Sequence, residues 1–288
     1  MMRKTWEEKM QLAQWNKRLK YIVCIDSDGT ALDTMNIKHI RCFGPCFVET
    51  FGLQAHKEEM LARWNAVNLF EKTRGKNRFI TLLQILREYN GRYFSYDLSA
   101  FAAWVESGTQ LSGRNLRSVA EASGDETEFL ALRWSDAVDA AIAQIAPEEK
   151  RPFDGVEKFL KDARGRADVA VVSSAGAAAL REEWARFGLD GYVDVMTSQE
   201  DGSKEDCIKA LIAKGYAPRE ILMIGDSFPD IEAAKDSGVW FYPILAGKEK
   251  ESWEALANTY FDAFLGGRYA EVQGGLCEAF YNNLNVKN

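Results

Sequence analysis

The stretch Tyr21–Thr34, YIVCIDSDGTALDT, constrains the fold of this chain more than any other. A short apolar run ends abruptly in two carboxylates, Asp26 and Asp28, which Gly29 follows. An apolar run bounded by a turn signal is typical of a buried strand in a parallel sheet. Ligands bind outside the carboxyl ends of such strands, so we expect both acids at the mouth of a ligand crevice. Gly29 allows the backbone to turn sharply away.

Two carboxylates this close in sequence need a neutralising cation or proton, because like charges repel. Mg²⁺ suits such a pair, since it binds a few hard oxygen ligands and keeps water or substrate oxygens on its other positions. An aspartate beside the ion can attack a phosphoryl group and form an aspartyl-phosphate. The second carboxyl can protonate the leaving oxygen and later activate water. The alternative for an isolated D-x-D is an acidic loop that only caps a helix, so the rest of the chain must decide.

Composition narrows the class of protein. A chain of 288 residues, 47% apolar, is long enough for one large domain or for a core with an inserted domain. The net charge of −7 argues weakly against nucleic acid as a partner. Five cysteines without zinc-site spacing favour a reduced, cytoplasmic protein. We see neither an apolar leader nor a run of the ~20 apolar residues that a membrane helix needs, so we expect no membrane association. The oligomeric state has no signature here.

Apolar periodicity predicts an α/β fold in which one helical block interrupts the βα alternation. Strands are expected at 21–25, 168–172, 192–196, 220–224 and 239–242. Between them, helices are expected at 154–163, 177–187, 203–213 and 229–235. The interrupting block shows helical spacing at 36–51, 57–70, 77–89, 98–106 and 126–145, with a kink at Gly44-Pro45. An amphipathic helix is expected at 4–19.

The pattern therefore predicts a Rossmann-like parallel-sheet core with an inserted all-helical domain. We expect the core at residues 1–33 and 152–250 and the insertion at 34–151. Residues 251–288 form a helical extension whose aromatic residues cover an apolar surface that the sequence does not identify.

Polar residues follow the later strands as well. The hydroxyl of Ser173 could hold a phosphoryl oxygen, and Lys204 could neutralise the charge that develops during phosphoryl transfer. Each residue also has a simpler interpretation: Ser173 or Ser174 as a helix N-cap, and Lys204 as a solvated helix residue. What favours the chemical interpretation is the combination, in this order, at the ends of parallel strands.

The strand expected at 220–224 leads into Asp226, with Asp230 four residues on. Asp226 could complete a Mg²⁺ site with Asp26 and the backbone carbonyl of Asp28. Asp230 could hold a metal-bound water or orient Lys204. Alternatively, Asp226 caps the helix that follows and Asp230 only favours its first turn.

These segments resemble the motifs of the haloacid dehalogenase-like hydrolase superfamily. The matching segments are DSDGT at 26–30, VVSS at 171–174, Lys204 in GSKED and GDSFPD at 225–230. The resemblance covers about residues 21–34 and 152–242. It implies that Asp26 is the nucleophile and Asp28 the general acid/base, that Ser173 and Lys204 bind phosphate, and that Asp26, Asp28 and Asp226 coordinate Mg²⁺. We add Asp230 to the metal site and Gly29, Thr30 and Ser174 to the substrate site.

Within this superfamily, a helical insertion directly after the first motif looks like the C1-type cap, which closes over the substrate. In it, TRGKNR at 73–78 places three cations around a glycine. This segment is either a solvated loop or a substrate loop, similar to those in caps of the β-phosphoglucomutase and phosphoglycolate phosphatase type. In the second case Arg74 and Arg78 could hold a distal anion. Lys38 and His39 are weaker candidates.

The carboxylate of Asp28 favours phosphate esters as substrates. A phosphonatase would have Ala at this position, and a 2-haloacid dehalogenase would lack the second Asp. The expected function is a Mg²⁺-dependent phosphatase acting on a small phosphorylated metabolite. The alternatives are a sugar-phosphate mutase of the β-phosphoglucomutase type and a catalytically silent binding or sensor protein. The sequence offers no account of Ser27 between the two acids, nor does it identify the substrate.

Overall fold

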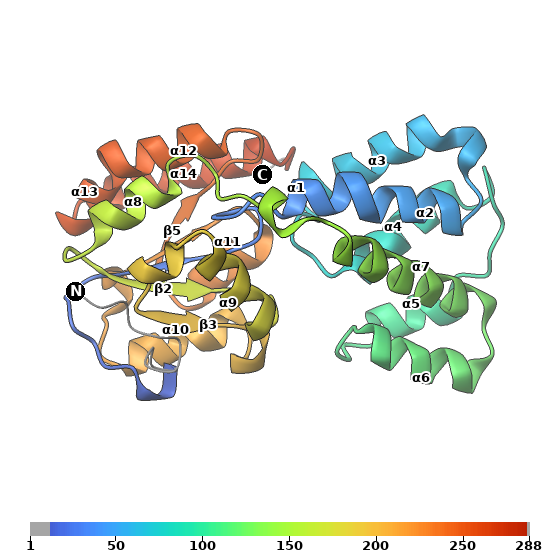
Figure 1. Ribbon diagram of the computed structural model, residues 1–288, viewed down its shortest axis with the longest axis horizontal. Helices are drawn as coiled ribbons and strands as arrows, with labels where there is room; N and C mark the ends of the chain where they lie inside the picture. Colours follow the sequence, from blue (N-terminus) through green and yellow to red (C-terminus); the bar gives the residue numbers. More distant parts are fainter. Residues whose placement is uncertain (1–11, 287–288) are drawn as a thin grey trace. The chain divides into compact units, whose positions relative to one another are not determined.

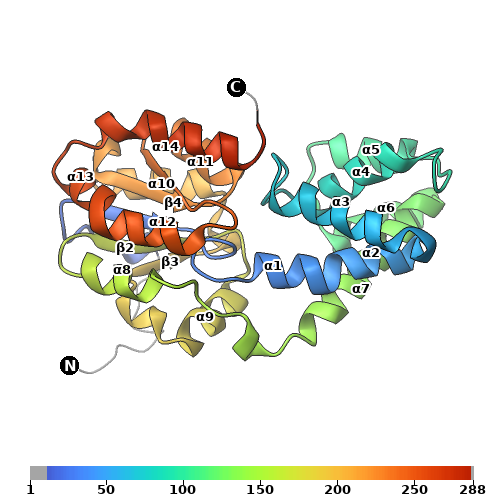
Figure 2. The ribbon, with the colours of Figure 1, turned by 90° about the horizontal axis from the view of Figure 1, so that it is seen from above.

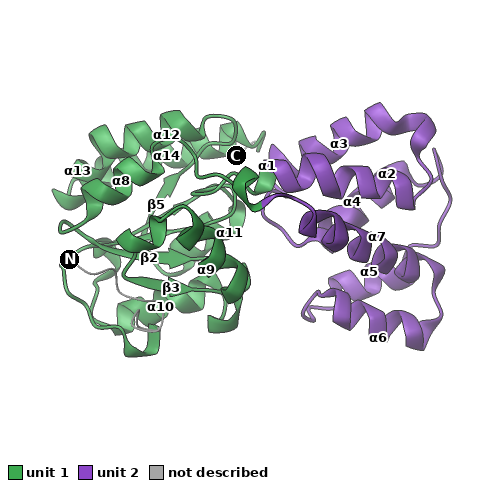
Figure 3. Ribbon diagram, in the orientation of Figure 1, with its two compact units in different colours: residues 1–35, 147–288 green, residues 36–146 purple. Residues whose placement is uncertain are grey.

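The computed structural model describes residues 12–286 and divides into two compact units (Figure 3). Unit 1 comprises residues 1–35 and 147–288, and unit 2 comprises residues 36–146. No helix in the described part of the chain combines the length and the apolarity that crossing a membrane requires.

Within the described residues of unit 1, five strands form one sheet in the order β3-β2-β1-β4-β5, and all neighbours are parallel (Figure 1). The strands are β1 Ile22–Ile25, β2 Asp168–Val172, β3 Val195–Thr197, β4 Ile221–Gly225 and β5 Trp240–Pro243. Because β1 lies between β2 and β4, its side chains are buried on both faces, which explains its unbroken apolar run. The predicted α/β fold is confirmed.

Helices cover both faces of this sheet (Figure 2). They are α8 Val156–Ala163, α9 Ala177–Arg186, α10 Lys204–Ala213, α11 Phe228–Asp236, α12 Glu249–Ala255, α13 Phe261–Leu265 and α14 Ala270–Asn283, with a π-helical turn at Leu256–Tyr260. One apolar core packs α8, α9, α12 and α13 against the sheet. The core on the opposite face packs α10, α11 and the end of α14.

The C-terminal helix α14 covers the edge strand β5. The Phe241 N–H donates to Gln273 Oε1 (3.0 Å), and the Tyr269 hydroxyl donates to Phe241 O (3.1 Å). Just past the strand, Asn283 accepts from the Ala246 N–H (2.9 Å) and donates to its carbonyl (3.1 Å). An uncovered edge strand would expose its backbone N–H and C=O groups for pairing with another chain. The C-terminal extension therefore covers the sheet edge and parts of both cores. This is the apolar surface that the sequence did not identify.

Residues 36–146 are all described, and every regular element among them is helical. Starting from α1 Met35–Lys38, the helices are a π-helical turn His39–Phe43, α2 Gly44–Thr50, α3 Lys57–Leu69, α4 Arg78–Tyr89, α5 Ser99–Glu106, α6 Gly113–Ser123 and α7 Glu126–Ala143. At Gly44-Pro45, where a kink is expected, a π-helical turn ends and the α-helix α2 begins. Proline lacks an N–H and interrupts the regular bonding of a helix, which accounts for the change.

The helix predicted for residues 4–19 is wrong over its described part. Residues 4–11 lie outside the described residues, and beyond them only Leu12–Gln14 form a short 3₁₀ turn. The N–H groups of Arg18 (3.1 Å) and Leu19 (2.8 Å) instead donate to the buried carboxylate of Asp168 at the start of β2. This bonding competes with a helix, and apolar spacing gives no sign of it.

Two further differences have local causes. Helix α6 was not predicted; it is mostly polar, and only Leu116 and Ala120 of its side chains are buried. The strand predicted at 192–196 begins at Val195, since Leu189–Tyr192 form a 3₁₀ turn.

Gly155 provides a test of how α12 packs on the start of α8. Its φ is +98°, and a Cβ there would lie 2.8 Å from the Cβ of Trp253. We expect Gly155→Ala to lower the free energy of unfolding by about 3 kcal/mol, from the left-handed conformation plus overpacking. The control Gly165→Ala has a similar φ of +80° but no atom within 4 Å, so about 1 kcal/mol is expected. Urea denaturation measures both, and equal losses would contradict the packing.

Candidate active site

Residues 26–34, which we call the acid loop, follow directly on β1. The Asp26 N–H donates to Ile224 O (3.0 Å), so the register of β1 with β4 continues into the loop. The loop then folds back on itself: the Leu32 N–H donates to Ser27 O (2.9 Å), and the Gly29 N–H donates to Leu32 O (2.9 Å). The predicted sharp turn at Gly29 is therefore present, and Asp26 is fixed at the carboxyl end of the central strand.

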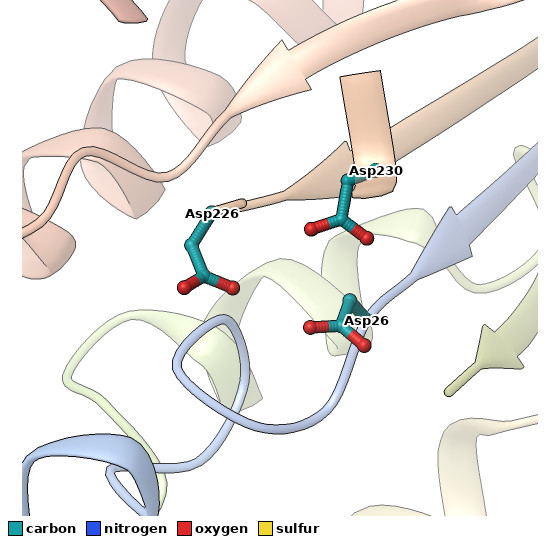
Figure 4. A group of neighbouring side chains, drawn as sticks. All are labelled: Asp26, Asp226 and Asp230. Atoms are coloured by element: carbon teal, nitrogen blue, oxygen red, sulfur yellow. The ribbon is translucent and has the colours of Figure 1, made fainter. Parts of the chain in front are cut away.

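Three buried carboxylates gather at this edge of the sheet (Figure 4). Asp26 follows β1, Asp226 follows β4, and Asp230 lies in the first turn of α11. One oxygen from each lies within 4.8 Å of the others. The carboxyl ends of adjacent parallel strands meet at one edge, and for this reason residues 200 positions apart converge.

The ammonium group of Lys204 lies between two of these acids. Its Nζ is 2.7 Å from Asp26 Oδ1 and 2.5 Å from Asp230 Oδ1, and the side chain is only 9% exposed. Burial alone would lower the pKa of Lys204, but the charges of Asp230 and Asp26 outweigh it and raise that pKa. Burial raises the pKa of Asp26 well above its ordinary value, and the Lys204 charge opposes that shift. Lys204 is therefore the local counter-charge for both carboxylates.

Both oxygens of Asp230 are bonded to protein groups. While Oδ1 receives Lys204, Oδ2 accepts the N–H (3.0 Å) and the hydroxyl (2.5 Å) of Ser227, the N-cap of α11. Gly225 leaves room for this arrangement, because a Cβ there would lie 2.3 Å from Asp230 Cγ. The capping alternative for Asp226 is therefore wrong, because Ser227 is the N-cap, whereas Asp230 lies in the first turn of α11 as expected and completes the capping box. Asp230 is also placed to orient Lys204.

Hydroxyl groups of the acid loop bond to its carboxylates. The Thr30 hydroxyl donates to Asp226 Oδ1 (2.6 Å) and lies 3.3 Å from Asp26 Oδ2. Asp28 is half-buried and lies outside the three-carboxylate cluster, and its carboxylate accepts a hydrogen bond from the Thr34 hydroxyl. The group of Asp28 that could bind a metal ion beside Asp26 and Asp226 is therefore its backbone carbonyl.

The serines after β2 differ from one another. Ser173 is buried, and its Oγ accepts the N–H of Ala175 (3.1 Å), which fixes the loop before α9. Ser174 is exposed, and the N-cap of α9 is Gly176, so the capping alternative is wrong for both serines.

Arg78 and His39 have defined partners inside unit 2. Arg78 donates to Asp139 (2.7 Å) and to Ser135 Oγ (3.1 Å), both on α7. His39 Nδ1 accepts the indole N–H of Trp64 (3.2 Å), which supports a structural role. Arg74 is fully buried and donates from Nη1 to Leu69 O (2.8 Å). Arg74 and Arg78 belong to unit 2, whereas the acid cluster belongs to unit 1.

Sequence reasoning missed four residues that hold the acid loop. Besides Thr34, they are Ser27 and two tryptophans, Trp184 and Trp253, which donate to Ser27 Oγ and Thr30 O. The one available signal was the hydroxyl of Ser27, at a position that otherwise looks apolar. No spacing rule connects it to a tryptophan 157 residues further on.

The donor set fits a divalent cation. Asp26 and Asp226 offer hard carboxylate oxygens at one point, where three buried carboxylates gather, and the buried ammonium of Lys204 contacts two of the three. The excess negative charge favours a bound cation, and hard oxygens are the ligands that Mg²⁺ prefers.

Lys204→Met tests whether this buried ammonium holds the acids together. Removing one partner leaves buried carboxylates without their counter-charge, so we expect the free energy of unfolding to fall by about 3–5 kcal/mol without divalent cations. Lys209→Met on the same helix is the matched control. Its ion pair with Glu205 is exposed, so no measurable change is expected. Equal stabilities of both variants in chemical denaturation would contradict the proposed role of Lys204.

Comparison with known proteins agrees with the motifs. The family model for haloacid dehalogenase-like hydrolases matches residues 92–244. A protein from Lactobacillus delbrueckii subsp. bulgaricus, provisionally named a phosphoglycolate phosphatase, is 19% identical with a TM-score of 0.50, over 78% of this chain and 86% of its own. A protein from Clostridium acetobutylicum, provisionally named a phosphatase, is 19% identical with a TM-score of 0.48, over 91% and 100%.

Because the Lactobacillus protein is only 19% identical to this chain, its structural similarity shows the fold alone. No curated protein matches the sequence. The family model, however, spans more than half of the chain. The resemblance that the motifs predicted is thereby confirmed, and the chain belongs to the haloacid dehalogenase-like hydrolase family.

Proposed function

We propose that this protein is a Mg²⁺-dependent phosphatase that hydrolyses a small phosphorylated metabolite through an aspartyl-phosphate on Asp26. The observation that carries the proposal is the contact of Lys204 Nζ with Asp26 Oδ1 (2.7 Å), beside the oxygens of Asp226. A nucleophile, a counter-charge and metal-ligand oxygens thus share one buried position. The names of the structural relatives, phosphatases among them, agree with this chemistry.

In the proposed reaction, a carboxylate oxygen of Asp26 attacks phosphorus and the bond to the leaving alcohol breaks. Lys204 balances charge on Asp26 and on the phosphoryl oxygens, where electrostatic stabilisation counts most. Asp28 gives a proton to the leaving alcohol. It then takes a proton from the water that hydrolyses the aspartyl-phosphate, which returns Asp26 and releases phosphate.

Asp26, Asp226 and the backbone carbonyl of Asp28 would hold Mg²⁺, which when bound neutralises phosphoryl charge. Asp230 is assigned to orienting Lys204, because both of its oxygens already accept from protein donors. In the proposed substrate site, the Ser173 hydroxyl binds the phosphoryl group, and Ser174 and Gly29 contribute to the same site. Thr30 fixes Asp226 through its hydroxyl.

We assign residues 36–146 to the C1-type cap and the remainder to the catalytic core. By resemblance, the cap closes over the substrate and selects it. Arg74 and Arg78 are the cap residues that we propose for a distal anion of the substrate.

Asp26→Asn tests the nucleophile. The amide is a poor nucleophile, so phosphate release should fall at least about a thousandfold while the fold is retained. The assay is a phosphate-release panel of phosphorylated metabolites with Mg²⁺, and Asp236→Asn, exposed at the end of α11, is the control. Activity of more than a few per cent in Asp26→Asn would refute the assignment. Isomerised sugar phosphate in place of phosphate would identify a mutase, and no turnover on the whole panel would favour a binding protein.

Asp226→Asn and Asp230→Asn separate a metal ligand from an orienting residue. Chelation should abolish turnover, and added Mg²⁺ should restore it. We expect Asp226→Asn to raise the Mg²⁺ concentration for half-maximal activity at least about tenfold. Asp230→Asn should lower kcat at an unchanged Mg²⁺ requirement, because its loss displaces Lys204. The reverse pattern would return Asp230 to the metal site.

A further inference from the structure

Two buried indole groups bond to the acid loop from outside the motif residues. Trp184 of α9 donates from Nε1 to Ser27 Oγ (2.9 Å), and Trp253 of α12 donates from Nε1 to Thr30 O (3.0 Å). Both tryptophans are 0% exposed. A buried indole N–H without an acceptor costs free energy, so each bond favours one position of the loop. The loop is thereby held at two points, one on each side of Asp28.

The bond from Trp184 fixes the first residue of the turn that follows Asp26. Ser27 is fully buried, and its carbonyl accepts the N–H groups of Ala31 (3.0 Å) and Leu32 (2.9 Å), which close the turn. Ser27 is the residue for which the sequence offered no account. Its hydroxyl is required as the acceptor for Trp184, and an apolar residue there would leave the indole N–H unbonded.

The bond from Trp253 reaches the cluster through Thr30. The backbone carbonyl of Thr30 accepts from Trp253, and its hydroxyl donates to Asp226 Oδ1 (2.6 Å). Trp253 itself has little room to move, since its ring packs on Phe159 (centroids 5.3 Å apart) and its Cβ abuts Gly155. Helix α12 of the C-terminal extension thus helps to position the carboxylate of Asp226 through Thr30.

We propose that Trp184 and Trp253 are positioning residues that hold the acid loop in the geometry that brings Asp26 and Asp226 together. The expected effect on kcat rests on the proposed function, but the hold of the two tryptophans on the acid loop does not depend on any substrate. It assigns a function to the C-terminal extension beyond covering the sheet: α12 helps to set the active-site geometry.

The test compares Trp253→Phe and Trp184→Phe with Trp240→Phe. Each substitution removes one indole N–H bond and keeps an aromatic ring. Trp240 is the matched control because its Nε1 also donates to a carbonyl, Arg219 O (3.2 Å), but at the start of β5, away from the carboxyl ends of the strands. Hydrogen–deuterium exchange of peptides covering residues 26–34 is the primary measurement, and Mg²⁺ affinity by calorimetry is the second.

We expect Trp253→Phe and Trp184→Phe to speed exchange in the acid loop about tenfold, and Trp240→Phe to leave it unchanged. Trp253→Phe should also weaken Mg²⁺ binding about tenfold, and both variants should lower kcat with KM within about twofold. Ser27→Ala removes the acceptor while it leaves both rings in place, so it must speed loop exchange even if a tryptophan variant misfolds.

Exchange in the acid loop that matches wild type in Ser27→Ala and in the folded tryptophan variants would overturn the proposal. Failure of the proposed function gives a different result: wild type would release no phosphate from any substrate. The exchange comparison would still decide whether the tryptophans hold the loop.

Discussion

The site depends on one buried ammonium group shared by two carboxylates. Removing Lys204, Asp26 and Asp230 from water is costly, and the attraction among them offsets that cost only at close range. Capping boxes built by Ser203 with Asp206 and by Ser227 with Asp230 fix the starts of α10 and α11, from which the lysine and one acid come. Hydrogen bonds between residues three apart in the sequence thereby help to fix the positions at which Lys204 and Asp230, which are distant in sequence, meet.

The order of the strands accounts for the rest of the arrangement. With β1 between β2 and β4, the residues that follow three adjacent strands meet at one edge. Lys204 reaches this edge from the face of the sheet that α10 and α11 cover, and the two tryptophans reach the acid loop from the other face. The loop that carries Asp26 and Asp28 is therefore held by charge from one layer and by indole hydrogen bonds from the other.

The sequence predicted the family, the parallel sheet and the residues at its edge, because apolar runs that end in acids are local patterns with a defined geometric outcome. It left Asp230 among three roles, since only the structure shows that Ser227 and Lys204 use both of its oxygens. It gave no sign of the bond from Trp253 to Thr30 across 223 residues, because apolar spacing indicates burial and not a hydrogen-bond partner.

The most direct test of the central claim, that these residues converge on one divalent cation, is a crystal structure of the protein with Mn²⁺ in place of Mg²⁺. Anomalous diffraction should give a single peak bonded to Asp26, Asp226 and the Asp28 carbonyl, at about 2.1 Å as expected for Mg²⁺. Lys204 should keep its contacts with Asp26 and Asp230. A peak elsewhere, or an ion bound by Asp230 with Lys204 displaced, would contradict the account.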